Sequence, residues 1–352
     1  MQPDEALDLA QRCAPRFAQA GLPAAPTITK VRAKRMCGLW AGMGAVYELV
    51  VSADGVADFA IVAKRISLPK NCSSIGDRRK KDSYDCEAAF YACGGGFAER
   101  LIKAGAAVPF PLLVERAPAL TICMTKLVGR SGSMHGEQTA AALSWLAKLH
   151  ASTWGAARAD AAVAGGLQAQ GTYWYLDTRP DELAAMPHRG WEGRLRLAAR
   201  ALDERLKAGA LQCIVHGDAK DANMLFAADG AALLYDFQYC GKAPPTKDLA
   251  YALTCASNAP EQEARLLEGY HAELSALLKA SGDAPSELSQ IQASLGLALA
   301  DLGRWMSGWG WWGHDLSHRI KPLLDTLDGG TPLASEEAYR EAVWRVYPEG
   351  AV

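Results

Sequence analysis

Residues 211–242, LQCIVHGDAKDANMLFAADGAALLYDFQYCGK, contain two short apolar runs, and each run ends on a charged segment. The runs 211–215 and 231–235 have the length and the bounded apolar character of buried strands. Asp218 follows the first run and Asp236 ends the second. A loop at a strand end can hold an ionised carboxylate in a fixed, hydrated position that an apolar core would not tolerate. We therefore expect the two aspartates to serve one polar site, as a base and a metal ligand.

The segment 216–223, HGDAKDAN, has the frame H-x-D-x-x-x-x-N of a kinase catalytic loop, with Gly217 in place of the usual arginine. Asp236 begins the triplet D-F-Q at the place where kinases have D-F-G. A phosphoryl group in transfer needs a carboxylate to accept the proton of the attacking hydroxyl, and magnesium to neutralise the phosphate charge. The spacing predicts that Asp218 is the base and that Asn223 and Asp236 bind Mg²⁺.

The run HGD-x-x-x-x-N-x-LF, followed by D-F-Q, resembles the choline kinase-like and ecdysteroid kinase-like branch of the aminoglycoside phosphotransferase group. The resemblance covers most of the chain and is most specific in this stretch. It implies an α+β, two-lobed protein-kinase-like fold with a small β-rich N-lobe and a larger helical C-lobe. It also implies an ATP-dependent, Mg²⁺-dependent phosphotransferase that acts on a hydroxyl of a small molecule. Lys220 would add positive charge near the transferred group.

The chain of 352 residues is longer than a single core usually supports, so two lobes are expected. The expected division is an N-terminal helical segment at 1–26, an N-lobe at 27–124 and a C-lobe at 125–352. Hydrophobic residues make up 50% of the chain, which argues against disorder. The net charge of −2 offers no general attraction to nucleic acid or to an anionic membrane.

The nine cysteines are scattered singly, without a C-x-x-C pair, which predicts reduced thiols in an intracellular protein. The N-terminal run MQPDE is acidic and lacks the basic residues and apolar block of a signal peptide. No apolar run approaches the length that spans a bilayer. We therefore expect a cytoplasmic protein with no nucleic-acid or membrane partner. The sequence does not determine its oligomeric state.

Residues 27–65 have the pattern of several strands, interrupted by the glycine-rich turn 38–47, GLWAGMGAVY. Glycines such as Gly42 and Gly44 let backbone amides approach phosphate oxygens without a side chain in the way. The turn lies where a kinase places its phosphate-covering loop, but it departs from G-x-G-x-x-G. A plain hairpin remains the alternative interpretation.

The run 59–66, FAIVAKRI, resembles the V-A-I-K strand of kinases and places Lys64 where it can reach the nucleotide phosphates. An ordinary solvated lysine on an edge strand is the alternative. Arg65 should point to the opposite face, because side chains alternate along a strand. In the helix that follows, Glu87 is the predicted carboxylate partner of Lys64, and Asp85 is the alternative.

Residues 108–114 and 119–124 have the pattern of the last two N-lobe strands, and residues 125–129 form the crossing to the C-lobe. In the family that the chain resembles, adenine lies against backbone groups of this crossing. The resemblance therefore implies nucleotide contacts from the main chain between Met124 and Leu127.

In the C-lobe, the run 146–151, LAKLHA, resembles a family helix, and its His150 is predicted to support the catalytic loop. Asp248 matches a family aspartate that ties the next helix to the backbone of that loop. The alanine- and glycine-rich segment 156–166 is predicted to be a mobile surface turn. Four tryptophans within 305–312 form either core, the interpretation favoured here, or a wall of the acceptor pocket, even a cation–π cage for a quaternary amine. No acidic cluster supports a polycationic acceptor.

Two other functions fit parts of the pattern. Lys220 favours a protein kinase, but Gly217, Gln238 and the absence of an A-P-E motif after Asp236 argue against it. A pseudokinase would keep the fold as a nucleotide-binding module without transfer. The intact set of a lysine, a base and two metal-binding side chains argues against that function.

Overall fold

The structure is a computed structural model that describes residues 1–24, 26–68, 72–256 and 260–352. The chain divides into two compact units. The first comprises Met1–Gly129 and Leu233–Gln238, and the second comprises Arg130–Ala232 and Tyr239–Val352. The short segment that contains Asp236 therefore belongs to the same unit as the N-terminal residues.

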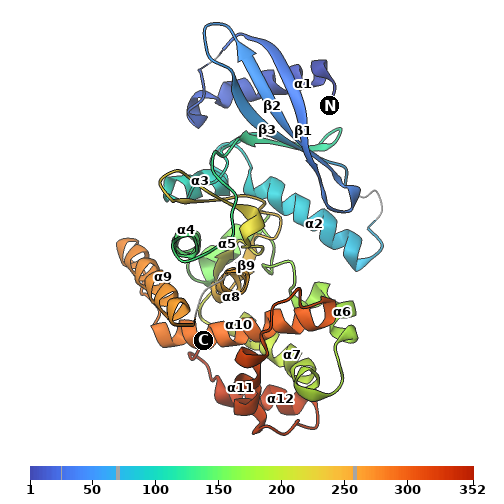
Figure 1. Cartoon of the computed structure of the whole chain (residues 1–352), viewed down its shortest axis with the longest axis vertical. Helices are drawn as coiled ribbons and strands as arrows, with labels where there is room; N and C mark the ends of the chain where they lie inside the picture. Colours follow the sequence, from blue (N-terminus) through green and yellow to red (C-terminus); the bar gives the residue numbers. More distant parts are fainter. Residues whose placement is uncertain (25, 69–71, 257–259) are drawn as a thin grey trace. The chain divides into compact units, whose positions relative to one another are not determined.

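The first unit is built on a five-stranded antiparallel sheet with the strand order β1-β2-β3-β5-β4. Its strands are β1 (Ile28–Gly38), β2 (Gly44–Ala53), β3 (Phe59–Ile66), β4 (Pro111–Glu115) and β5 (Leu120–Thr125). Its helices are α1 (Pro3–Cys13), α2 (Ile75–Phe90) and α3 (Phe97–Lys103). These elements occupy the blue-to-green part of the colour scale in Figure 1.

The helix α1 lies along one face of the sheet, as Figure 1 shows. Its apolar side joins one hydrophobic cluster with sheet residues such as Ile61 and Ala63 of β3. Because side chains alternate along a strand, Lys64 points to the opposite face of the sheet. Arg65 points back toward α1, where its guanidinium pairs with Glu5. Lys64 and Arg65 therefore point to opposite faces of the sheet, as predicted.

The second unit is mostly helical. Its helices are α4 (Glu137–Ser152), α5 (Ala156–Ala164), α6 (Pro180–Ala185), α7 (Gly190–Ala208), α8 (Thr246–Cys255), α9 (Pro260–Ala280), α10 (Leu288–Trp309), α11 (Ser317–Asp328) and α12 (Glu336–Val346). The helix α10 packs against α6, α7, α8 and α11 (Figure 1). The remaining strands are β6 (Cys213–Val215), β7 (Met224–Phe226), β8 (Ala232–Leu234) and β9 (Gly241–Ala243), of which β6 and β9 pair antiparallel.

A buried ionic contact fixes the start of α8 on α10. Asp301 of α10 lies 3.1 Å from Nζ of Lys247 and 2.8 Å from Nη2 of Arg304, and all three side chains are at most 5% exposed. Removing one partner of such a buried pair costs about 3–5 kcal/mol, because the other charge is left uncompensated. This contact holds the part of α8 that carries Asp248.

The prediction of a mobile turn at 156–166 was wrong, because residues 156–164 form the helix α5. Alanine has the highest helix propensity, and six of the nine residues of the helix AARADAAVA are alanine. Ala159 and Ala162 are buried, so packing supports the helix as well. Within the described part of the chain, every helix is too short or too polar to cross a membrane.

Candidate active site

Lys64 on β3 lies between two carboxylates of the first unit. Its Nζ is 2.6 Å from Oε2 of Glu87 on α2 and 3.0 Å from Oδ1 of Asp236. The side chains of Lys64 and Glu87 are 7% and 2% exposed, whereas that of Asp236 is 34% exposed. The lysine is therefore a buried cation in a fixed position, and one of its two partners remains open to solvent.

The orientation of α2 about its own axis decides which acidic residue of this helix reaches Lys64. Glu87 lies on the buried side of the helix. Asp85 lies on another side, where it is 2.5 Å from Nζ of Lys81 and also pairs with Arg116. Of the two candidates in the sequence, the structure places Glu87 against the lysine.

The buried pair has shifted proton affinities. Burial raises the pKa of Glu87 to about 7, although the adjacent Lys64 cation opposes this shift. For Lys64, burial acts to lower the pKa, but the carboxylates of Asp236 and Glu87 outweigh it and hold the pKa above its ordinary value. The lysine is therefore cationic at neutral pH, whereas the proton occupancy of Glu87 changes near neutrality.

Asp236 has a left-handed backbone, with a φ of 69°. Its neighbour Phe237 is buried, and the Phe237 ring stacks on Phe90 of α2 with 3.8 Å between the centroids. A non-glycine residue in a sparsely populated conformation costs about 1–3 kcal/mol, and such residues cluster at functional sites. The stacked Phe237 anchors the segment that presents the Asp236 carboxylate to Lys64.

The glycine-rich turn connects β1 to β2 through a short 3₁₀ segment, Trp40–Gly42. A Cβ on Gly44 would lie 2.0 Å from the carbonyl oxygen of Arg65, so only glycine fits the close approach of β2 to β3. A Cβ on Gly42 would meet nothing within 4 Å, but this residue has a φ of +72°. Gly44 therefore has a packing role, and Gly42 supplies a left-handed turn with an open surface.

The predicted adenine-binding segment follows the end of β5. Met124 is 7% exposed and pairs in register with Val62 of β3. Thr125 is the last residue of the strand, so Leu127 lies beyond the sheet ladder. The main chain after Thr125 is thus outside the regular strand, at the place where the sequence predicts nucleotide contacts.

In the second unit, Asp218 follows β6 and is contacted by two predicted site residues. Nδ2 of Asn223 donates to Oδ2 of Asp218 at 2.8 Å and to its backbone oxygen at 3.0 Å. Nζ of Lys220 lies 3.1 Å from the same Oδ2. Because Nδ2 of Asn223 is committed to Asp218, its Oδ1 is the atom that can coordinate a cation.

The donor chemistry fits magnesium better than a transition metal. Amide and carboxylate oxygens are the ligands that Mg²⁺ prefers, and the two residues predicted to bind it, Asn223 of the second unit and Asp236 of the first, carry one of each. In the described residues, no group of three or more His, Cys, Asp or Glu side chains is placed to hold a metal. Mg²⁺ commonly uses only one or two protein ligands together with substrate phosphates, so a larger cluster is not required.

The backbone of the loop before Asp218 is held by Asp248 at the start of α8. Its Oδ2 accepts from the N–H of His216 at 2.7 Å, and its Oδ1 accepts from the N–H of Gly217 at 2.9 Å. His150 lies 3.2 Å from Oδ2 through Nε2 and 2.8 Å from the hydroxyl of Tyr270 through Nδ1. His150 and Asp248 are both fully buried. The two residues therefore position the loop from inside the unit.

The backbone around Gly217 explains why this loop has glycine where the H-R-D motif has arginine. Gly217 has a φ of +80°, and a Cβ there would lie 2.1 Å from the carbonyl oxygen of Tyr239 and 2.7 Å from the amide nitrogen of Thr172. The backbone of another segment thus occupies the space that the arginine side chain of a protein kinase would need.

A model of the phosphotransferase enzyme family matches residues 88–288. The chain belongs to this family. The matched residues include the segment 216–223 and Asp236, and they begin after Lys64. The predicted enzyme class, a small-molecule phosphotransferase, is therefore confirmed.

Solved structures show the fold of this phosphotransferase. A spectinomycin phosphotransferase in complex with ADP and spectinomycin matches with a TM-score of 0.52 and 11% identity, over 97% of this chain and 98% of that chain. A choline/ethanolamine kinase family protein from Mesorhizobium loti matches with a TM-score of 0.47 and 16% identity, over 96% and 99% of the two chains. No curated protein sequence matches the chain significantly. The predicted protein-kinase-like fold is confirmed.

The sequence did not identify Tyr173 and Tyr251 as neighbours of the loop that contains Asp218. The amide of Tyr173 donates to the carbonyl of Gly217 at 3.3 Å, and the two tyrosine hydroxyls are 2.9 Å apart. Burial, together with the carboxylate of Asp218, raises the pKa of both phenols. The aromatic run 173–175 was the available signal, but local pattern alone does not show which distant loop it contacts.

The four tryptophans near the end of α10 do not share one environment. Trp305 is 1% exposed and packs in the core, as predicted. Trp309 and Trp312 are 50% and 53% exposed, so the core interpretation fails for them. The side chain of Trp311 contacts Trp191 at 5.6 Å between ring centroids.

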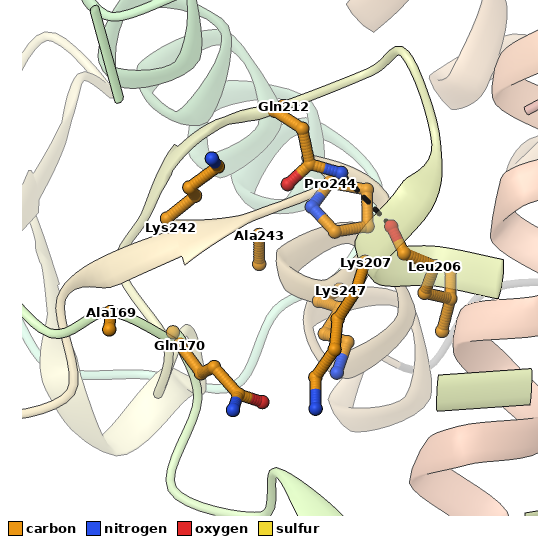
Figure 2. Close-up of a pocket in the computed structure, with 10 residues that line it drawn as sticks. Ala169, Gln170, Leu206, Lys207, Gln212, Lys242, Ala243, Pro244 and Lys247 are labelled. Carbon is orange, nitrogen blue, oxygen red and sulfur yellow. Dashed lines mark hydrogen bonds between the residues drawn. The ribbon is translucent and has the colours of Figure 1, made fainter. Parts of the chain in front are cut away.

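Figure 2 shows a pocket of the phosphotransferase that contains none of the predicted site residues. Its lining includes Lys207, Lys242 and Lys247, together with Gln212, which donates to the carbonyl of Leu206. Each of the three lysines already pairs with a carboxylate. The lysines therefore do not make this pocket an anion-binding site by themselves.

Proposed function

We propose that this phosphotransferase transfers the γ-phosphoryl group of ATP to a hydroxyl of a small molecule, in a Mg²⁺-dependent reaction. The observation that supports the proposal most strongly is the setting of Asp218. Its carboxylate is mostly buried, is contacted by Asn223 and Lys220, and lies in a loop whose backbone is held by Asp248. That setting gives a fixed proton acceptor at the end of a strand.

In the proposed reaction, Asp218 accepts the proton of the acceptor hydroxyl as the oxygen attacks the γ-phosphorus. The new phosphorus–oxygen bond forms while the bond to the bridging oxygen of ADP breaks. Asp218 then holds the proton, and the products are a phosphomonoester and ADP. Lys220, 3.1 Å from Asp218, adds positive charge near the transferred group.

Nucleotide binding is assigned to the first unit. Lys64, oriented by Glu87, would pair with the nucleotide phosphates, and Gly42 and Gly44 would let backbone amides approach them. Backbone groups from Met124 to Leu127 would contact the adenine. Bound Mg²⁺ would neutralise phosphate charge.

Asn223 through Oδ1 and Asp236 through its carboxylate are the residues proposed to hold the metal. Asp236 suits this role because it is partly solvent-exposed although it pairs with Lys64. The ADP found in the spectinomycin phosphotransferase also fits a nucleotide substrate for a protein of this fold.

The experiment that tests the proposal is ³¹P NMR of ATP and Mg²⁺ with a pooled metabolite extract, comparing the wild type with Asp218→Ala. A new phosphomonoester signal that appears only with the wild type is the expected result. Binding of ATP without any phosphorylated product would favour a nucleotide-binding pseudokinase. Phosphorylation of added protein substrates in place of small molecules would favour a protein kinase.

A further inference from the structure

Aromatic side chains of the second unit form a continuous group, which we call the tryptophan cluster: Tyr173, Trp305, Trp309 and Trp312. The ring centroid of Trp305 is 4.9 Å from that of Tyr173, 6.1 Å from that of Trp309 and 5.0 Å from that of Trp312. Buried Trp305 thus connects Tyr173 to the two half-exposed indoles.

The cluster is joined to the catalytic loop at Tyr173. Nζ of Lys220 lies 3.1 Å from Oδ2 of Asp218 and 5.8 Å from the centre of the Tyr173 ring. The amide of Tyr173 donates to the carbonyl of Gly217 at 3.3 Å. One end of the cluster therefore lies beside the proposed base, within the same unit.

The other end of the cluster is open to solvent. Within the described part of the second unit, Trp309 and Trp312 are the large hydrophobic side chains that are exposed. Trp312 also has a φ of +46°, which bulky residues rarely adopt. Strain of this kind concentrates at functional sites, so an outward indole on a strained backbone indicates a binding role.

Three of the four rings of the cluster already contact a cation. The guanidinium carbon of Arg179 lies 5.6 Å from the ring centroid of Tyr173, 5.8 Å from that of Trp305 and 5.9 Å from that of Trp309. Arg179 is 5% exposed and pairs with Glu182 at 3.0 Å. A second cation at these faces would be repelled by the guanidinium and would lose the cation–π contacts that Arg179 already makes.

Besides Asp218, the carboxylates of Glu182 and Glu192 contact residues around the cluster among the described residues. Glu182 pairs with Arg179. Oε1 of Glu192 accepts from Oγ of Ser307 at 2.7 Å and from Nε1 of Trp311 at 3.3 Å.

We propose that Trp309 and Trp312 bind the acceptor of this phosphotransferase, and that the acceptor presents an uncharged apolar body to them, not an ammonium group. The inference rests on the proposed transfer to a hydroxyl at Asp218. Indole faces gain free energy by covering flat apolar surface, and this gain requires no charge on the ligand.

Choline and neohexanol form a matched pair of probes. The branch point is a cationic nitrogen in choline and a neutral carbon in neohexanol. Phenethyl alcohol adds a flat ring to the same hydroxyethyl group. Binding to the full chain would be measured by saturation-transfer NMR with Mg²⁺ and a non-hydrolysable ATP analogue present. Neohexanol and phenethyl alcohol are expected to bind at least about tenfold more tightly than choline.

The variants Trp309→Ala and Trp312→Asn test the location of binding, and asparagine suits the positive φ at the second position. Each should weaken phenethyl alcohol binding by about tenfold, and Trp309→Tyr should restore most of it. Trp344→Ala on α12 is the matched control, because it removes a partly exposed indole outside the cluster and should leave binding unchanged.

Choline binding as tight as neohexanol binding would overturn the inference. Unchanged probe binding in both tryptophan variants would overturn it too, as would failure of both neutral probes to bind the wild type. The readout is binding, so it is separate from the proposed transfer. If the neutral probes bind at the tryptophans while no alcohol is phosphorylated, the proposed function fails and this binding site stands.

Discussion

Nζ of Lys64 lies 2.6 Å from Oε2 of Glu87, and both side chains are almost completely buried. Replacing Lys64 with methionine would remove the cation proposed to pair with the nucleotide phosphates. Charge-assisted hydrogen bonds of this kind are worth about 1.5–3 kcal/mol, so the affinity for Mg²⁺-ATP should fall by about 10- to 100-fold. Calorimetric titration with a non-hydrolysable ATP analogue measures this change.

The control for Lys64→Met is the double variant Lys64→Met/Glu87→Gln, since the single change leaves the Glu87 carboxyl buried without its cation. The double variant should recover thermal stability and still bind nucleotide weakly. Wild-type nucleotide affinity in a folded Lys64→Met protein would remove Lys64 from the proposed site.

The raised pKa of Glu87 predicts a pH dependence of nucleotide use. Lowering the pH through about 7 protonates Glu87 and weakens its hold on Lys64, so the KM for ATP should rise in acid. In Glu87→Gln, the KM should be high and should vary much less across the same interval. The KM for ATP of the wild type and of Glu87→Gln is obtained from initial rates between pH 5.5 and 8.5, which covers about 1.5 pH units on either side of the transition. Parallel pH profiles of the two proteins would argue against this assignment.

The same shift has a defined effect on stability. The folded-state pKa of Glu87 lies above the ordinary value of 4.5, so the folded protein binds this proton more tightly between pH 4.5 and about 7. The contribution of this carboxyl to the free energy of unfolding therefore falls as pH rises through that window. The difference in unfolding free energy between the wild type and Glu87→Gln, measured by denaturant titration at each pH, should show this slope.

Gly217→Ala should damage the catalytic loop without removing any functional group. The new Cβ would lie 2.1 Å from the carbonyl oxygen of Tyr239, and the residue would keep a φ of +80°. The backbone strain alone costs about 1–3 kcal/mol. We expect a lower Tm and a loss of turnover, measured by thermal unfolding and by the phosphomonoester assay. Gly230→Ala, at a turn with a φ of +86° and nothing within 4 Å, is the matched control for backbone strain without a clash. Equal effects of the two changes would show that close packing at Gly217 is unimportant.

Asp248→Asn should destabilise the loop that carries Asp218. The two carboxylate oxygens accept from the amides of His216 and Gly217, and an asparagine can accept at only one of these positions. An unsatisfied buried donor costs about 1–3 kcal/mol. The unfolding free energy and kcat should both fall, while the affinity for nucleotide should change little. A variant with normal kcat would show that the loop does not depend on this anchor.

Much of the site follows from local sequence. The alternation of FAIVAKRI predicts that Lys64 and Arg65 face opposite sides of a strand, and the structure has this arrangement. The segment HGDAKDAN predicts Asp218 as the base and Asn223 as a metal ligand, and in the structure one 3₁₀ turn brings the Asn223 amide to the Asp218 carboxylate. These features depend on a few neighbouring residues, so short patterns suffice to predict them.

Other features depend on residues far apart in the sequence. The choice between Asp85 and Glu87 depends on the rotation of α2 against the sheet, which the acidic run alone does not fix. Likewise, no local pattern shows that Arg179 lies among the rings of Tyr173 and Trp305. The tryptophan run was expected to be core, and only tertiary packing separates buried Trp305 from its exposed neighbours.

The proposed transfer reaction requires separate roles for Asp218, as the base, and Asp236, as a metal ligand. The decisive measurement compares turnover and Mg²⁺-dependent ATP binding in Asp218→Asn and Asp236→Asn. A positioned general base contributes about 10²–10⁴-fold to the rate, so Asp218→Asn should lose turnover by that factor and bind ATP normally. Asp236→Asn should lose Mg²⁺-dependent binding as well. Wild-type turnover in Asp218→Asn, measured with a verified acceptor, would show that Asp218 is not the base.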